Sequence, residues 1–170
     1  MDRLRALLRI AACRLDIISQ KLRATIKSTH TQIFRQRDNM DISLITTLIN
    51  HDNKLDGYVY VKEACERLLK NSLNDPKSVS IVIQAANVFQ PEVPELAQIA
   101  GILSKSSQSF SDDSHDDYLE KKLIKPSDDL IQSYIQTLFP PDSLTHNASI
   151  SLDTELENRF KSLRRIGDSK

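Results

Sequence analysis

Mostly apolar side chains recur every three or four positions along the first 33 residues, a spacing that places them on one stripe of an α-helix. The stripe comprises Leu4, Leu8, Ala11, Leu15, Ile18, Leu22, Ile26, Thr29 and Ile33. At about 1.5 Å per residue, the predicted helix is a rod about 50 Å long. The pattern stops at residues 36–39, where Asp38 or Asn39 is expected to cap a second helix over about residues 41–71.

The second predicted helix has its own apolar positions and a single soft spot at Gly57. Those positions are Ile42, Ile45, Leu48, Ile49, Leu55, Val59, Cys65, Leu68 and Leu69. Two consecutive helices of about 30 residues, joined by a tight turn, predict a long antiparallel hairpin.

Shorter elements follow the hairpin. Residues 78–89 are apolar on nearly all sides and predict a buried helix, and Pro91 and Pro94 introduce a fourth helix that continues to Leu103. A Ser- and Asp-rich loop is expected over residues 104–117, then a weak helical stretch at 118–124 and a fifth short helix that begins after Pro126. Residues 140–152 form a predicted linker before a last amphipathic segment at 153–166.

Composition supports this all-α prediction. Three Gly among 170 residues are too few for the many tight turns of a β-sandwich or barrel. Aromatic residues make up 5% of the chain, so the core is expected to be aliphatic and a deep aromatic-lined substrate pocket is not expected.

Charge is distributed unevenly, although the formal net charge is zero. Residues 1–37 contain nine Lys or Arg and two Asp, whereas the rest of the chain is mildly acidic. Four of these bases share a stripe roughly 100° from the apolar one; they are Arg5, Arg9, Arg23 and Lys27. Such a face predicts an anionic partner, either a membrane surface, nucleic acid or an acidic protein face, and a plain solvated helix face is the alternative.

No catalytic or cofactor-binding pattern is present in the sequence. It lacks a P-loop, a GxSxG or HExxH motif and a paired-glycine fingerprint, so a non-enzymatic protein without a cofactor is expected. Cys13 and Cys65 have no metal-ligand spacing to each other or to the four His, and both are expected to be reduced and buried. The basic N-terminal residues interrupt any signal-peptide core and no apolar run is long enough to span a membrane, so a cytoplasmic location is expected.

The last amphipathic segment has a recognisable pattern. It reads Asp153-x-x-Leu156-x-x-Arg159-Phe160-x-x-Leu163-Arg164 and resembles the type-one MIT-interacting motif of ESCRT-III proteins, with Phe160 in place of the motif's second Leu. Leu156, Phe160 and Leu163 form a stripe that fits a groove between helices, and Arg159 and Arg164 can reach acidic residues at its rim. The alternative is that this segment folds back onto the core.

The core is similar to the increased-sodium-tolerance (Ist-type) family of ESCRT-III-like regulators of the vacuolar-protein-sorting AAA ATPase. The resemblance covers about residues 3–139 and rests on helix order, on Ser78-Val79-Ser80-Ile81-x-Ile83-x-Ala85-Ala86 followed by Glu92-Val93-x-Glu95-Leu96, and on Leu130-Ile131-x-x-Tyr134-Ile135. It implies an ESCRT-III-like core over residues 1–139, in which two shorter helices and a fifth helix pack on the hairpin, and a detached helix at 153–166. The chain departs from the family in its short linker and in lacking a proline-rich type-two motif, because residues 90–94 are better explained as a helix–helix turn.

The resemblance implies an adaptor and assembly subunit in endosomal sorting at the multivesicular body and in membrane scission, peripheral to endosomal membranes. The terminal segment (Asp153, Leu156, Arg159, Phe160, Leu163, Arg164) would bind the MIT domain of the ATPase. Type-one charged multivesicular body proteins would bind the core, and the basic stripe would contact anionic membrane or a neighbouring subunit in a homo- or hetero-polymer. A helical nucleic-acid-binding module that uses the first helix is the alternative, although no aromatic residues interleave with its bases for stacking.

Overall fold

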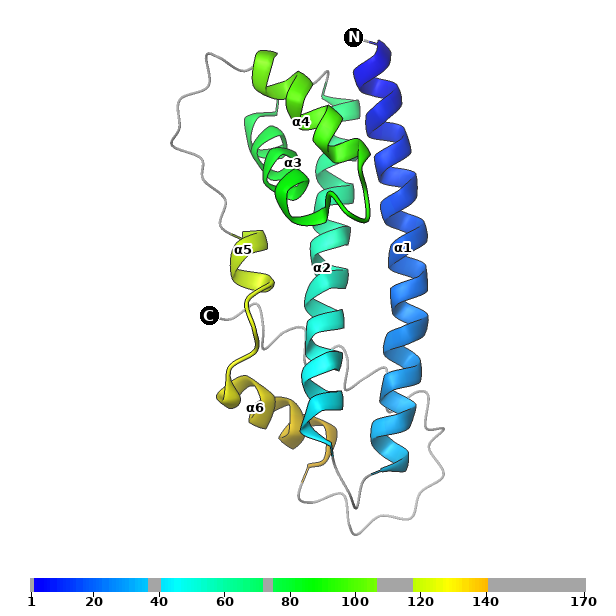
Figure 1. The fold of residues 1–170 in the computed structure, drawn as a ribbon, viewed down its shortest axis with the longest axis vertical. Coiled ribbons are helices and arrows are strands. Elements are labelled where there is room, and N and C mark those ends of the chain that lie inside the picture. The colour runs from blue at the N-terminus through cyan, green and yellow to red at the C-terminus, as the bar shows by residue number, and fades with distance from the viewer. Residues whose placement is uncertain (1, 37–40, 72–74, 107–117, 141–170) are drawn as a thin grey trace.

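The chain folds into a set of helices arranged along one long hairpin (Figure 1). The computed structural model describes residues 2–36, 41–71, 75–106 and 118–140. All regular elements within these ranges are helices: α1 (Asp2–Arg35), α2 (Ile42–Lys70), α3 (Pro76–Phe89), α4 (Glu95–Ser106), α5 (Tyr118–Lys122) and α6 (Asp128–Leu138). The all-α prediction is confirmed. The predicted linker and the detached helix at 153–166 lie outside the described residues.

α1 and α2 lie side by side and antiparallel, as the spacing of apolar residues predicts (Figure 1). Seven of the nine predicted stripe positions on α1 are buried, and Ile18 and Leu22 are partly buried. The expected cap of α2 is wrong, because the helix begins later than Asp38 or Asn39 would require. The Asp41 carboxylate accepts a hydrogen bond from the Ser43 N–H at 2.8 Å and therefore caps α2.

α3 and α4 cover the end of the hairpin that contains the start of α1 (Figure 1). α3 starts with Pro76 in its first turn and buries seven of its residues, in agreement with its apolar sequence. The connection to α4 is tight, since the Val93 N–H donates to the Phe89 carbonyl at 2.8 Å and the Val93 side chain is fully buried. Residues 90–94 are thus a helix–helix turn, as the sequence analysis favoured.

Two separate hydrophobic clusters hold the fold together. The first joins α1, α2, α3 and α4 with Leu119 of α5. The second lies near the hairpin turn, where Ile131 and Leu138 of α6 pack against apolar residues of α1 and α2. α6 is capped by Ser127, whose Oγ accepts from the Leu130 N–H at 3.3 Å. α6 therefore packs back on the hairpin, and the weak stretch at 118–124 is a separate short helix, α5.

Gly57, the expected soft spot of α2, is also a point of close packing. A Cβ at this position would lie 2.9 Å from Cζ of Phe89 and 3.6 Å from Cδ2 of Leu119. The Phe89 ring also contacts the ring of Tyr58, with 4.8 Å between centroids. The missing side chain thus allows α3 and α5 to approach α2.

The two cysteines have different environments. Cys65 is fully buried in α2, and burial raises the pKa of its thiol to about 12. Cys13 is exposed, so the prediction that both cysteines are buried is wrong for this residue. The reason is its position on α1, about 160° around the helix from the centre of the buried stripe.

Candidate functional site

The predicted basic stripe lies on the accessible surface of α1. Arg5, Arg9, Arg23 and Lys27 are all exposed. Their spacings of 4, 14 and 4 residues place them within about 40° of each other around the helix axis. The four bases therefore project to one side of a straight rod, as predicted.

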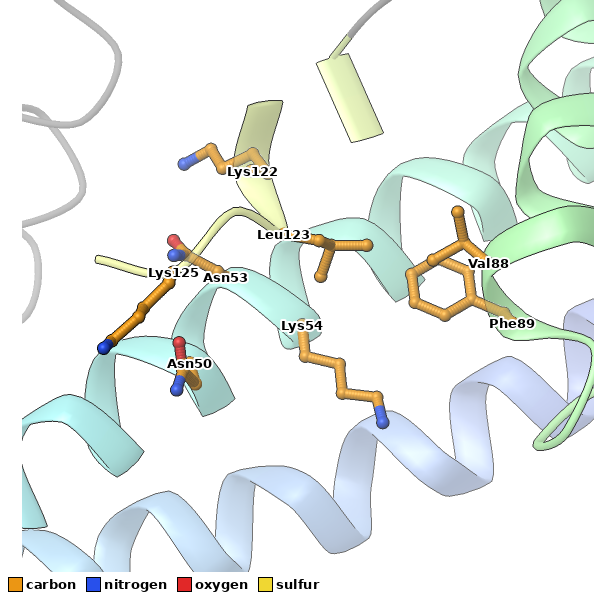
Figure 2. A pocket seen from close by; sticks show the side chains of 8 residues that line it. All are labelled: Asn50, Asn53, Lys54, Val88, Phe89, Lys122, Leu123 and Lys125. Atoms are coloured by element: carbon orange, nitrogen blue, oxygen red, sulfur yellow. The ribbon is translucent and has the colours of Figure 1, made fainter. Parts of the chain in front are cut away.

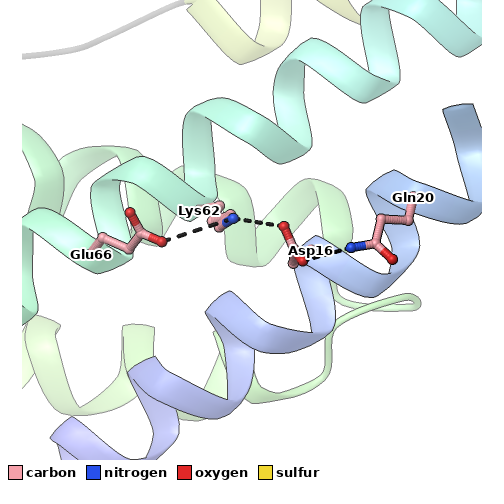
Figure 3. Close-up of polar contacts among 4 residues, drawn as sticks. All are labelled: Asp16, Gln20, Lys62 and Glu66. Atoms are coloured by element: carbon pink, nitrogen blue, oxygen red, sulfur yellow. Dashed lines mark hydrogen bonds and ion pairs between the residues drawn. The ribbon is translucent and has the colours of Figure 1, made fainter.

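An acidic residue divides this stripe at its centre, which the sequence analysis missed. Asp16 lies seven residues from both Arg9 and Arg23, a spacing that places it on the same stripe. Figure 3 shows its contact with α2: Lys62 Nζ donates to Asp16 Oδ1 at 2.7 Å, and Gln20 Nε2 donates to Asp16 Oδ2 at 3.0 Å. The stripe thus consists of two basic pairs separated by an interhelical ion pair.

Electrostatics at this ion pair favour the charged form of both partners. The hydrogen bond and positive charge of Lys62 lower the pKa of Asp16, and the same hydrogen bond raises the pKa of Lys62. Lys62 Nζ also lies 3.9 Å from Glu66 on α2 (Figure 3). Since these side chains are half-exposed, the pair joins α1 to α2 but adds little stability.

A second row of bases runs along the other side of α1, and the sequence analysis did not identify it. It consists of the exposed residues Arg3, Arg14 and Lys21. Arg14 Nη2 lies 2.8 Å from Oε1 of Glu95 in α4, so this row borders α4 whereas the first borders α2. The sequence contains the signal for this row, because spacings of 11 and 7 residues also place Arg3, Arg14 and Lys21 on one helical stripe.

The second predicted site lies outside the described residues. It is the terminal stripe of Asp153, Leu156, Arg159, Phe160, Leu163 and Arg164. Its contacts, and the alternative in which it folds back onto the core, remain predictions from the sequence.

A cavity of about 440 Å³ lies between α2, the end of α3 and the connection from α5 to α6 (Figure 2). Its lining residues are Asn50, Asn53, Lys54, Val88, Phe89, Lys122, Leu123 and Lys125. Two of the lysines already pair with carboxylates: Lys54 with Glu92 at 2.6 Å and Lys122 with Asp56 at 3.3 Å. Burial lowers the pKa of Lys54, but the hydrogen bond to Glu92 and the charges of Tyr58 and Glu92 together outweigh burial and raise the pKa. An anionic ligand would therefore have to compete with two internal carboxylates for these lysines.

In the part of the chain that the structure describes, no group of three or more His, Cys, Asp or Glu is placed to hold a metal ion. His30 is buried in α1, and desolvation lowers its pKa to about 4. It is consequently neutral near pH 7. Among the described helices, none combines the length and the apolar character needed to cross a membrane.

No protein-family model matches this chain, and no curated protein matches it either. The two basic rows of α1 and the terminal sequence motif are therefore the features that point to a function.

Proposed function

We propose that this chain is a non-enzymatic, ESCRT-III-like adaptor and assembly subunit in endosomal sorting and membrane scission, and that it binds and regulates the AAA ATPase that disassembles ESCRT-III. The observation that carries the proposal is the sequence of residues 153–164, which resembles a type-one MIT-interacting motif at every position but one. The long α1–α2 hairpin, with shorter helices packed along it, supports the proposal because the resemblance of residues 3–139 to the Ist-type family implies such a core.

The terminal segment would act as the handle for the ATPase. When the segment is helical, its residues Leu156, Phe160 and Leu163 form one apolar stripe, which would lie in a groove of the MIT domain. Arg159 and Arg164 flank this stripe and would pair with acidic residues at the rim of the groove. Phe160 has a larger side chain than the Leu of the motif and therefore requires a wider groove.

The core would contribute the assembly function. Type-one charged multivesicular body proteins would bind it, and the basic row of α1 would contact anionic membrane or the acidic face of a neighbouring subunit. The exposure of Arg5, Arg9, Arg23 and Lys27 supports this role, since all four are accessible to a large partner. Either contact is electrostatic and would weaken with added salt.

Calorimetric titration of the full chain with the MIT domain of the AAA ATPase tests the proposal. We expect micromolar binding that Leu163→Asp abolishes, because the new carboxylate would be buried without a partner. Asn158→Asp is the matched control, since it adds the same charge on the opposite side of the predicted helix and should retain binding. Absence of binding by the unmodified chain, or equal binding by the Leu163→Asp chain, would contradict the proposal.

Nucleic-acid binding by α1 is the alternative function, and the exposed basic row favours it. Titration of random duplex DNA over a range of salt concentrations separates the two. A steep loss of affinity with salt, starting from micromolar or tighter binding, would favour the nucleic-acid module.

A further inference from the structure

The face of α1 that points away from the protein carries a second apolar stripe. Ile10 and Ile17 are each 49% exposed, and the exposed Cys13 lies between them. The exposed residues Ala6 and Ala24 extend the stripe in both directions. Helical spacing places all five within about 60° of each other, on the side opposite the buried stripe. α1 is therefore apolar on two opposite faces.

No described part of the chain covers this stripe. α1 forms one edge of the molecule, and α2 lies on its inner side (Figure 1). The other large exposed apolar residues in the described ranges, Ile42 and Ile124, stand apart from the stripe, at the start of α2 and after α5. Ile10 and Ile17 thus form a local apolar surface. Such a surface indicates a contact, whereas single exposed apolar residues scattered over a protein need no explanation.

The charges on either side of this stripe indicate what would cover it. The row of Arg5, Arg9, Arg23 and Lys27 runs along one side, and the row of Arg3, Arg14 and Lys21 runs along the other. An apolar strip between two basic rows matches the surface of an anionic bilayer, because Ile side chains enter the acyl boundary while Arg and Lys extend to the phosphates. A second copy fits poorly, since symmetric pairing of this face would oppose bases with bases.

We propose that α1 lies in the plane of an anionic membrane, with Ile10 and Ile17 inserted between the two basic rows. This inference rests on the membrane contact in the proposed function and adds an apolar component to it. Salt screens the contact of the bases with lipid headgroups but leaves burial of the isoleucines intact. Part of the membrane binding is therefore resistant to salt.

Vesicle sedimentation of the full chain tests this component. Vesicles of phosphatidylcholine with phosphatidylserine are compared with phosphatidylcholine alone, at low salt and at about 0.5 M salt. The Ile10→Ser/Ile17→Ser chain should bind anionic vesicles about tenfold more weakly than the unmodified chain and lose its salt-resistant binding. The matched control is Ile42→Ser/Ile124→Ser, which removes two isoleucines elsewhere that are at least as exposed as Ile10 and Ile17, and this chain should bind normally.

Cys13 supplies a direct probe of insertion. Cys13 is exposed within the stripe, whereas Cys65 is buried. A thiol-reactive fluorophore therefore labels Cys13 and leaves Cys65 unlabelled in the native chain. Anionic vesicles should shift the emission of the label to shorter wavelength, and lipids with a nitroxide on the acyl chain should quench it. A shift that grows with protein concentration in the absence of vesicles would assign the stripe to a second copy and overturn the inference.

A charge variant separates failure of this inference from failure of the membrane contact itself. If Ile10→Ser/Ile17→Ser binds like the unmodified chain while Arg5→Glu/Arg9→Glu does not, the contact is purely electrostatic and insertion is wrong. If the unmodified chain binds neither type of vesicle, insertion and membrane contact are both wrong. The titration with the MIT domain then tests the remaining proposal independently.

Discussion

Replacement of Gly57 by Ala should destabilise the protein, although Ala is the better helix former. In a helix interior, Gly to Ala gains about 1 kcal/mol from reduced backbone entropy in the unfolded state. At Gly57 the new Cβ would lie 2.9 Å from Cζ of Phe89, so the ring must move. Phe89 is 1% exposed and contacts Tyr58, which leaves it little space.

The magnitude follows from the difference between these two effects. Overpacking of a filled core costs about 1–3 kcal/mol, and the gain in helix propensity offsets about 1 kcal/mol of it. We expect the free energy of unfolding to fall by about 1 kcal/mol. Gly101→Ala is the matched control, because Gly101 is also inside a helix but has no atom within 4 Å of its built Cβ. Gly101→Ala should therefore stabilise the protein by up to about 1 kcal/mol.

Urea unfolding followed by circular dichroism at 222 nm measures both changes. The two variants should differ from each other by about 2 kcal/mol, with the unmodified chain between them. Equal stabilisation by both substitutions would refute the reasoning, since it would mean that Phe89 shifts at no cost and that Gly57 is not required for close packing.

Three further outcomes follow from the described residues. The unfolded chain binds a proton at His30 near pH 6.5, whereas the folded chain binds it only near pH 4. The free energy of unfolding should therefore fall by about 2 kcal/mol from pH 7 to pH 5. Urea titrations measure this fall, and an equal fall in a His30→Gln chain would contradict the prediction. A colorimetric thiol reagent should modify Cys13 rapidly and Cys65 only after denaturation, and rapid modification of two thiols in native protein would be inconsistent with the buried Cys65. Arg5→Glu/Arg9→Glu should reduce binding to anionic vesicles at low salt without changing thermal stability, because both side chains are exposed; unchanged sedimentation would remove these two residues from the contact.

Local sequence information predicted the helices because their apolar positions are regular. The stripe from Leu4 to Ile33 defined the length of α1 to within a few residues, and the helix expected over residues 78–89 is α3, which begins two residues earlier, at Pro76. The turn before α2 was less certain, since several acidic and amide residues in a row can each act as a cap. Asp41 acts as the cap in the structure, and the sequence favoured its neighbours.

Features that depend on how helices meet could not be predicted in the same way. The function of Gly57 depends on Phe89, which is 32 residues away in the chain, and the pairing of Asp16 with Lys62 depends on the register between α1 and α2. The position of Cys13 on the helix indicates exposure, but cysteine is usually buried, and that general tendency led to the expectation of burial. The basic stripe was predictable as a surface feature because long charged side chains seldom lie in a core.

The division of the core into two clusters affects how the protein unfolds locally. α3 contributes six buried side chains to the first cluster, whereas α6 contributes two buried side chains, Ile131 and Leu138, to the second. Backbone amides in α6 should therefore exchange with solvent through small openings that leave the first cluster intact. We therefore expect the packing at the turn of the hairpin to open before the packing at its other end.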